Sequence, residues 1–326
     1  MSSSAVPFGA ALPTDRLAPV VPGGAGAASL PRPSTARDFW MVMKPNVMQL
    51  VVFTGWVGIY LAPGRLHPLL GLTAVLCIAA AAGASAAINN WFDADIDQHM
   101  ARTRLRPTAS GAVPPGEALA LGITLSILSV AVMGLALNWT AGAFLAGTIG
   151  FYVFVYTFWL KRRTPQNIVI GGAAGALPPV IGFAAVTGGV DLLPVLLFLI
   201  VFAWTPPHFW ALALYRSGDY ARVGVPMLPV VAGRLQTRRH ILAYAALLVP
   251  LSLAPVATGD LGALYASAAL GASGGFAWLA WRLYREDSDR LAMQVFKYSL
   301  AYLFGLFGAM ALDRYWGFSQ AAFGGA

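Results

Sequence analysis

Charged side chains are scarce in this sequence. Lys, Arg, Asp and Glu together account for 10% of the 326 residues, whereas about 25% is usual for soluble domains. Hydrophobic residues reach 58%, so the shortage of charge excludes an ordinary soluble fold and indicates a chain embedded in lipid. Cysteine is almost absent as well, because Cys77 is the only one, and this excludes a disulfide within the chain.

The N-terminal segment lacks a long apolar run. Residues 1–37 are rich in Ser, Pro, Ala and Gly and have no apolar core of the kind that a secretory signal needs. We expect this segment to be a disordered cytosolic tail. No soluble insertion interrupts the rest of the sequence, so residues 38–318 are predicted to form one transmembrane domain, followed by a short C-terminal tail at 319–326.

Apolar runs long enough to cross a bilayer recur along the transmembrane domain. Crossing the hydrocarbon layer takes about 17–25 residues as a helix. The runs predict an all-α membrane bundle of about nine transmembrane helices. They lie near residues 46–63, 69–91, 117–137, 140–160, 167–188, 192–214, 240–258, 261–283 and 294–316.

The basic residues fall almost entirely on one side of this predicted bundle. Of the 21 Lys and Arg residues, all but Arg65 and Arg314 lie before the first predicted span, where Lys44 is the last of them, or in alternate loops. Lys and Arg accumulate in cytosolic loops. We therefore expect a multi-pass protein with a cytoplasmic N-terminus and an outer C-terminus, in a bacterial inner membrane. The net charge of +8 reflects this orientation and does not indicate binding to nucleic acid.

An acidic cluster follows the second predicted span. Asn89, Asp93 and Asp97 are spaced four apart, so they share one face if the helix continues, and we call these three residues the acidic face. Carboxylates at this spacing repel each other and are costly near hydrocarbon without a positive partner. Amide and carboxylate oxygens suit Mg²⁺. Asp95 points to a different face. Alternatively, the carboxylates form a solvated loop edge whose charge balances the nearby arginines.

Two basic clusters lie on the same side of the membrane as the acidic face. Arg102, Arg104 and Arg106 follow it directly, and residues 161–163 end the fourth span. Arginine side chains match phosphate oxygens. Carboxylates for a metal together with arginines for an anion predict a site for a metal-bound diphosphate. Taken alone, residues 161–163 are equally compatible with a topology anchor.

The order of these motifs resembles that of the UbiA-type intramembrane prenyltransferases. The pattern Asn89-x₃-Asp93-x₃-Asp97 and the segment after it, at 100–107, resemble the first signature of that family. The resemblance covers roughly residues 40–315. Within the family, four segments resemble the haem O synthase branch in particular, and these are 156–172, 175–179, 204–210 and 224–229.

This resemblance implies an enzyme that transfers a farnesyl group from farnesyl diphosphate to a vinyl group of haem B, releasing diphosphate. Haem B is then a substrate, and the implied cofactor is Mg²⁺ held by the acidic face. The basic residues implied to act on the diphosphate are Arg102, Arg106, Lys161 and Arg162. The residues implied to contact substrates are Tyr156, Thr103, Asn167, His208, Trp204 and Asp219.

Two of these residues have alternative readings. His208 lies in a span whose paired prolines, Pro206 and Pro207, should break the helix. Its imidazole could contact or ligate haem, or it could be a packed, hydrogen-bonded core histidine. Asp219 is the only acidic residue of its loop, where many family members carry more than one aspartate. It either completes the diphosphate site or orders the loop.

Competing functions remain at this point. The nearest is a UbiA-type enzyme that prenylates a quinone precursor or another aromatic acceptor. A secondary transporter would place charges near the bilayer midplane and show an internal repeat, and neither feature is evident in the sequence. The resemblance also leaves open an association with haem A synthase or oxidase assembly proteins.

Overall fold

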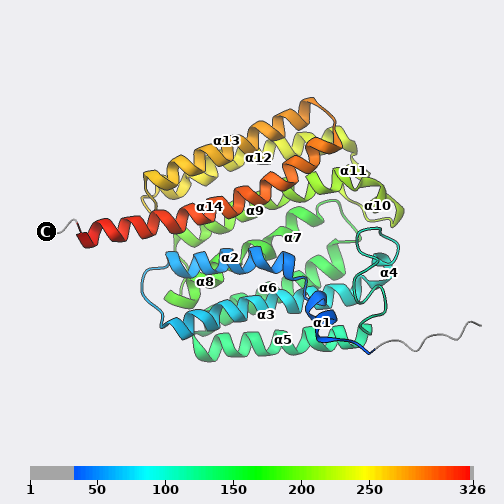
Figure 1. Cartoon of the computed structure of the whole chain (residues 1–326), viewed down its shortest axis with the longest axis horizontal. Helices are drawn as coiled ribbons and strands as arrows, with labels where there is room; N and C mark the ends of the chain where they lie inside the picture. The colour runs from blue at the N-terminus through cyan, green and yellow to red at the C-terminus, as the bar shows by residue number, and fades with distance from the viewer. Residues whose placement is uncertain (1–32, 324–326) are drawn as a thin grey trace, which may run out of the picture. The chain divides into compact units, whose positions relative to one another are not determined.

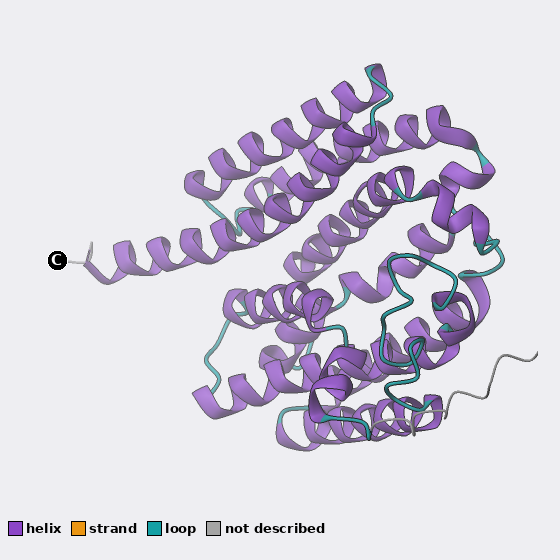
Figure 2. Ribbon diagram, turned by 45° about the vertical axis from the view of Figure 1, so that its right-hand side comes forward, coloured by secondary structure: helices purple, strands orange, loops and turns teal. Residues whose placement is uncertain are grey.

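The computed structural model describes residues 33–323, with side chains to residue 317, and all regular structure in this range is helical (Figure 2). The predicted N-terminal tail therefore lies outside the described residues up to position 32. Helix α1 (Ala36–Val42) begins just inside the predicted tail. Thr35 caps it reciprocally, since its side chain accepts from the backbone of Asp38 and its backbone donates to the Asp38 carboxylate.

The predicted membrane bundle is confirmed. Within the described range, eight helical stretches are long and apolar enough to cross a membrane, and α2 (Pro45–Leu61) is a shorter apolar helix. The eight stretches are α3 (Pro68–Phe92), α5 (Pro115–Ala136), α6 (Trp139–Gly150) with η1 (Phe151–Leu160), α7 (Asn167–Ala176) with α8 (Pro178–Thr187), α9 (Leu192–Tyr215), α12 (Gly233–Ala257), α13 (Ala263–Arg285) and α14 (Asp289–Phe323) up to residue 317.

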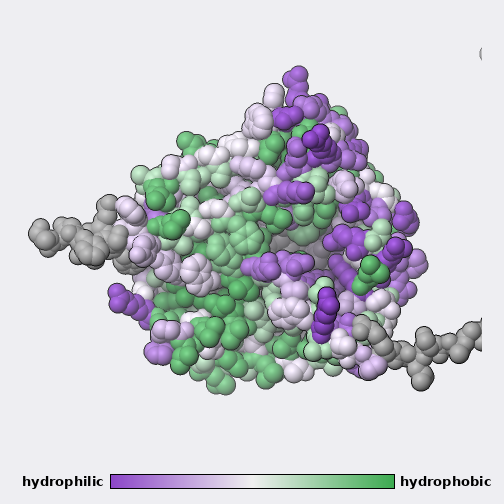
Figure 3. Space-filling model, viewed as in Figure 1, coloured by the Kyte–Doolittle hydropathy of each residue, from purple (hydrophilic) through white to green (hydrophobic). Residues whose placement is uncertain are grey.

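Short helices lie at one end of the bundle. Figure 1 places α4 (Ala94–Asp97), α10 (Ser217–Arg222) and α11 (Leu228–Val231) at the same end, which we call the polar end. In Figure 3 hydrophilic residues gather there, while the middle of the molecule is largely hydrophobic. Large apolar side chains are exposed along the spans, including Leu76, Ile127 and Leu270. Such exposure suits contact with lipid, and the chain is an integral multi-pass membrane protein.

Prolines behave differently in two of the spans. Pro178 and Pro179 begin α8 and thus separate it from α7. The predicted break at Pro206 and Pro207 is wrong, because α9 runs through both residues. Neighbouring helices support a membrane helix at such positions, and α9 packs against α7, α12 and α14.

Glycines allow α2 and α8 to approach closely. A Cβ atom on Gly58 would lie 2.1 Å from the Pro179 carbonyl oxygen. One on Gly182 would lie 2.1 Å from the carbonyl oxygen of Gly55. Small residues are the usual means of such packing in lipid. This contact joins two buried hydrophobic clusters, one built mainly from α9, α12, α13 and α14 and the other mainly from α3, α6 and α8.

Candidate active site

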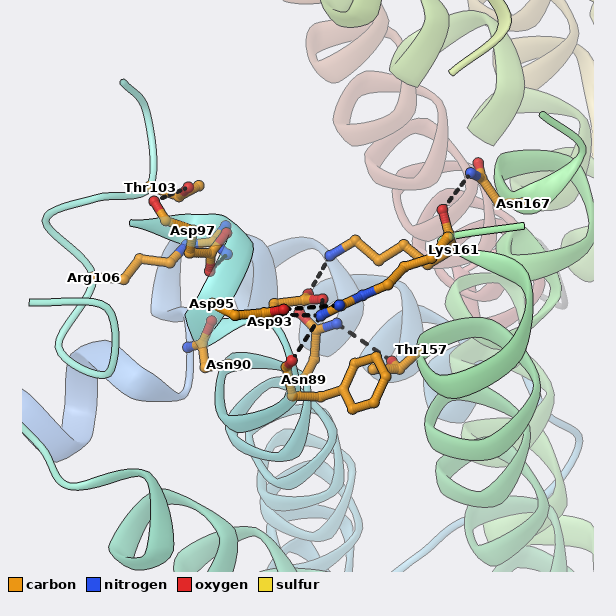
Figure 4. Close-up of polar contacts among 12 residues, drawn as sticks. Asn89, Asn90, Asp93, Asp95, Asp97, Thr103, Arg106, Thr157, Lys161 and Asn167 are labelled. Atoms are coloured by element: carbon orange, nitrogen blue, oxygen red, sulfur yellow. Dashed lines mark hydrogen bonds and ion pairs between the residues drawn. The ribbon is translucent and has the colours of Figure 1, made fainter. Parts of the chain in front are cut away.

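The acidic face lies at the polar end, where α3 gives way to α4. Although α3 ends at Phe92, backbone bonds of 2.9 Å run from Asp93 N to Asn89 O and from Asp97 N to Asp93 O. The helical spacing therefore continues through the junction and keeps the three side chains on one side, as the sequence predicts. All three are at least 97% buried. In Figure 4, Asn89 and Asp93 lie toward the end of η1, while Asp97 lies next to Arg106.

Each carboxylate of the acidic face makes one close ion pair with a basic side chain, and Asp93 has a second, longer contact with Arg162 at 3.8 Å. Lys161 Nζ donates to Asp93 Oδ2, and Arg106 NH1 lies 2.6 Å from Asp97 Oδ2. These partners come from two different segments, one at the end of η1 and the other after α4. Buried carboxylates require such compensation. The structure thus brings together four of the residues that the sequence singled out.

Asn89, the third member of the acidic face, meets a basic residue that sequence reasoning missed. Lys44 Nζ donates to Asn89 Oδ1 at 2.6 Å, while Asn89 Nδ2 donates to Thr157 Oγ1 at 3.3 Å. Lys44 had counted only as one of the charges that indicate orientation. The available signal was its place directly before the first apolar run, where a basic side chain can reach the membrane edge.

Three basic side chains, Lys44, Arg106 and Lys161, are in contact with the acidic face. Burial lowers the pKa of Lys44 well below its ordinary value, and repulsion from Arg106 and Lys161 lowers it further. Asp93 and Asp97 oppose this shift but do not reverse it. An anion bound nearby would offset the repulsion among these basic side chains.

The π-helix η1 contacts α3 through Thr157, which accepts a hydrogen bond from Asn89. Its wider turn is seen in the backbone bond from Lys161 N to Tyr156 O, five residues back. Tyr156 packs against Tyr152, with ring centroids 5.1 Å apart, and against Gly171, where a Cβ atom would lie 2.2 Å from the Tyr156 ring. Gly171 is therefore needed for this ring position. π-helical turns are frequent at functional sites.

The donor atoms of the acidic face fit Mg²⁺. Asp93 Oδ1 is buried without a hydrogen-bond partner, although Arg162 NH2 lies 3.8 Å away. Among the described residues, no three His, Cys, Asp or Glu side chains form a group that could hold a metal by themselves. One amide and two carboxylates thus need further ligands, and Mg²⁺ typically takes these from substrate phosphates and water.

Two of the predicted diphosphate-binding arginines make no hydrogen bond with the acidic face, although Arg162 NH2 lies 3.8 Å from Asp93 Oδ1. Arg162 pairs with Asp95 through two contacts of 2.9 and 2.7 Å, and its guanidinium stacks 4.6 Å from the ring centroid of Phe92. This hydrogen bond lowers the pKa of Asp95. Arg102 is exposed and makes no hydrogen bond or ion pair with any other described residue.

Two of the predicted substrate-contacting residues support the backbone. Thr103 Oγ1 donates to the Asp97 carbonyl oxygen at 3.1 Å, which closes the turn after α4. Asn167 Nδ2 donates to the Lys161 carbonyl oxygen at 3.2 Å, while Asn167 Oδ1 is buried without a hydrogen-bond partner. Both side chains therefore hold residues that carry the ion pairs.

Asp219 lies in α10 with loosely held partners. Arg216 NH1 and Arg222 NH1 lie 3.9 and 3.6 Å from its two carboxylate oxygens. Both arginines belong to the same short segment. Asp219 Oδ2 is buried without a hydrogen bond. Asp219 is therefore held only by long, local contacts and keeps one oxygen without a hydrogen bond.

His208 belongs to α9, and its side chain packs against α14. Its ring stacks on Trp204 and Phe296, with centroids 4.3 and 4.6 Å away, and its Nδ1 lies 2.6 Å from Ser299 Oγ. Trp204 Nε1 donates to the Ser299 carbonyl oxygen at 2.7 Å. Within the described residues, His208 therefore has the contacts of a packed, hydrogen-bonded core histidine.

Comparisons with known proteins relate the whole bundle to one family. The model of the UbiA prenyltransferase family matches residues 51–306. A protoheme IX farnesyltransferase from Parvibaculum lavamentivorans is 57% identical over 295 residues, which is 89% of this chain and 92% of that protein.

Solved structures share the fold. The apo structure of a UbiA homolog from Aeropyrum pernix K1 has a TM-score of 0.68 at 22% identity, covering 82% of this chain and 98% of that one. A UbiA homolog from Archaeoglobus fulgidus bound to DMAPP and Mg²⁺ has a TM-score of 0.64 at 15% identity, covering 84% and 99%.

Proposed function

The chain belongs to the UbiA prenyltransferase family, and from that premise we propose that it transfers the farnesyl group of farnesyl diphosphate to a vinyl group of haem B. The observation that carries this proposal is the buried acidic face with its basic partners at the polar end. The acceptor is supported by the 57% identical relative, whose name specifies protoheme IX and a farnesyl group. A quinone precursor is the alternative acceptor.

Mg²⁺ would be held by Asn89, Asp93 and Asp97, together with oxygens of the diphosphate. This assignment is supported by Asp93 Oδ1, which is buried and makes no hydrogen bond, and by the Mg²⁺-bound homolog. When bound, Mg²⁺ supplies positive charge that neutralises the diphosphate and improves it as a leaving group.

The basic side chains of the site supply the remaining stabilisation. Lys161 and Arg106 are already held next to the acidic face by their ion pairs. Negative charge grows on the diphosphate oxygens as the bond between farnesyl C1 and oxygen breaks. Positive groups fixed in advance at that position stabilise the transition state without reorganisation.

Bond formation takes place on the organic half. The allylic cation left by C–O cleavage accepts an electron pair from the vinyl group of haem B, which forms the new C–C bond. Water then adds to the resulting cation and loses a proton, giving a hydroxyethylfarnesyl group. Tyr156, held against Gly171 beside the acidic face, offers an aromatic face to the allylic cation.

His208 is proposed to contact the haem through Nε2. Ser299 Oγ donates to the Phe296 carbonyl oxygen at 2.6 Å, so the same Oγ accepts a hydrogen bond from His208 Nδ1. Nε2 is then the unprotonated nitrogen, and it makes no hydrogen bond with a described residue. A neutral imidazole with its second nitrogen held by a hydrogen bond is the form that ligates haem iron.

The site opens toward the cytoplasm in this proposal. The polar end carries the loops in which the basic residues accumulate, so the positive-inside rule places it on the cytosolic side of a bacterial inner membrane. The N-terminus is then cytoplasmic and the C-terminus outside.

The deciding experiment supplies membranes carrying the expressed protein with haem B, farnesyl diphosphate and Mg²⁺, and identifies the haems by liquid chromatography and mass spectrometry. We expect a haem whose mass has increased by a farnesyl group plus water, and none when a chelator is present. Unmodified haem B beside a prenylated quinone precursor would contradict the acceptor and retain the prenyl transfer.

A further inference from the structure

Lys44 has a backbone conformation that L residues rarely adopt. Its φ and ψ are 55° and 60°, and it is the only non-glycine residue with a positive φ in the described part of the chain. The following residue is Pro45, which disfavours the right-handed helical conformation at Lys44. The chain therefore turns sharply between α1 and α2, and this turn directs the lysine side chain.

Two adjacent asparagines of α3 hold this corner. Asn90 Nδ2 donates to the Val42 carbonyl oxygen at 2.7 Å, and Asn89 Oδ1 accepts from Lys44 Nζ at 2.6 Å. Met43, between Val42 and Lys44, packs closely on Gly83 of α3: a Cβ atom on Gly83 would lie 3.0 Å from the Met43 sulfur. The position of the amine is thus fixed from both sides of Lys44.

The amine of Lys44 occupies an oxygen that the proposed metal also needs. A cation bound at Asn89 Oδ1 would meet the amine that already donates a hydrogen to the same oxygen at 2.6 Å, and the positive end of that N–H group repels a cation there. Lys44 must therefore leave Asn89 when the metal enters. Once displaced, a partly buried amine requires another acceptor. Diphosphate oxygens would arrive at that position together with the metal.

We propose that Lys44 is a positioning residue whose amine gives up its hydrogen bond to Asn89 and donates to the diphosphate instead. Mg²⁺ and diphosphate then bind cooperatively. The inference rests on the proposed function, since it assumes the diphosphate substrate. The metal alone binds weakly because it competes with the amine, and diphosphate strengthens metal binding because it gives the amine a new partner. Coupling of this kind is reciprocal, typically about 5- to 150-fold in affinity.

The test measures metal binding to the purified full-length chain in detergent, without any turnover. Mn²⁺ replaces Mg²⁺ so that free and bound ion can be separated by electron paramagnetic resonance, with and without inorganic diphosphate. Titrations without protein correct for the metal–diphosphate complex in solution. For the natural chain, we expect diphosphate to lower the apparent Kd for the metal by at least about tenfold.

In Lys44→Met, we expect the metal alone to bind more tightly than in the natural chain and the effect of diphosphate to shrink about tenfold. Lys297→Met is the matched control, because Lys297 is exposed and makes no ion pair with a described residue. If Lys44→Met does not fold, Lys44→Gln carries the same expectation, because it keeps a donor for Asn89 and loses the charge.

Two results would overturn the exchange. One is weaker binding of the metal alone in a folded Lys44 variant, since competition requires the opposite. The other is an unchanged diphosphate effect. Haem modification by the natural chain is measured on the same preparation, so active protein with either result disproves the exchange and leaves the proposed function standing. Inactive natural protein would instead count against the proposed function.

Discussion

The segments that follow α3 and α9 both bring aspartates to the polar end, but they hold them in different ways. After α3, Asp93 and Asp97 are almost fully buried and each has a basic partner in close contact. After α9, Asp219 is only partly buried, and its two arginine neighbours lie 3.6 and 3.9 Å away. The same residue type is therefore fixed in one segment and loosely placed in the other.

The difference arises from where the partners come from. Lys161 reaches Asp93 from the end of η1, 68 residues along the chain. The neighbours of Asp219 lie three residues before and after it in the same segment, so they move with it. A carboxylate held by a distant element is preorganised by the fold, whereas one held locally can adapt to a ligand. We infer that the first segment carries the chemistry and the second adjusts to the substrate.

The comparison would break if the two segments were equally sensitive to loss of a charge. Asp93→Asn removes a proposed metal ligand and leaves the Lys161 amine without its charged partner in a partly buried position. We expect haem modification to fall by roughly 10³-fold or more. Initial rates with membranes of equal protein content measure this. A thermal unfolding curve close to that of the natural chain is the control, and near-normal turnover would contradict the metal assignment.

Asp219→Asn should have a smaller effect. Because its arginine contacts are local and long, we expect roughly tenfold loss, expressed mainly in KM for farnesyl diphosphate. Steady-state rates over a range of substrate concentrations separate KM from kcat. A loss as large as that of Asp93→Asn, with unchanged KM, would instead place a second metal ligand in α10.

The sequence predicted the first segment because its spacing translates directly into geometry. Residues four apart lie on one helical face, and the polar groups placed there required positive partners. Charge distribution among the loops likewise predicted which helix ends meet, and the structure places α4 and the end of η1 together. These inferences needed only local periodicity and the membrane.

Other features depend on contacts that no local pattern encodes. The π-helical turn of η1 changes which residues face α3, and nothing in the composition of residues 151–160 signals it. Lys44 reaches Asn89 only because Asn90 holds the α1–α2 corner. The continuity of α9 through Pro206 was mispredicted for the same reason, since packing against neighbouring helices decides whether a proline breaks a helix.

The smallest effect is expected from breaking the ion pair between Arg162 and Asp95, because Asp95 lies in the first segment but is exposed. This pair tests whether a charge in the first segment matters because it is buried or because it lies in that segment. Arg162→Gln should lower the free energy of unfolding at neutral pH by only about 0.2–1 kcal/mol. The bond to Arg162 lowers the pKa of Asp95 in the folded state, so the pair stabilises above the ordinary carboxyl pKa and loses this effect as pH falls through the lowered value. Thermal unfolding of both chains at descending pH should thus show a small difference that disappears in acid. A large difference that persisted there would mean that Arg162 supports the fold through Phe92 and not through the carboxylate.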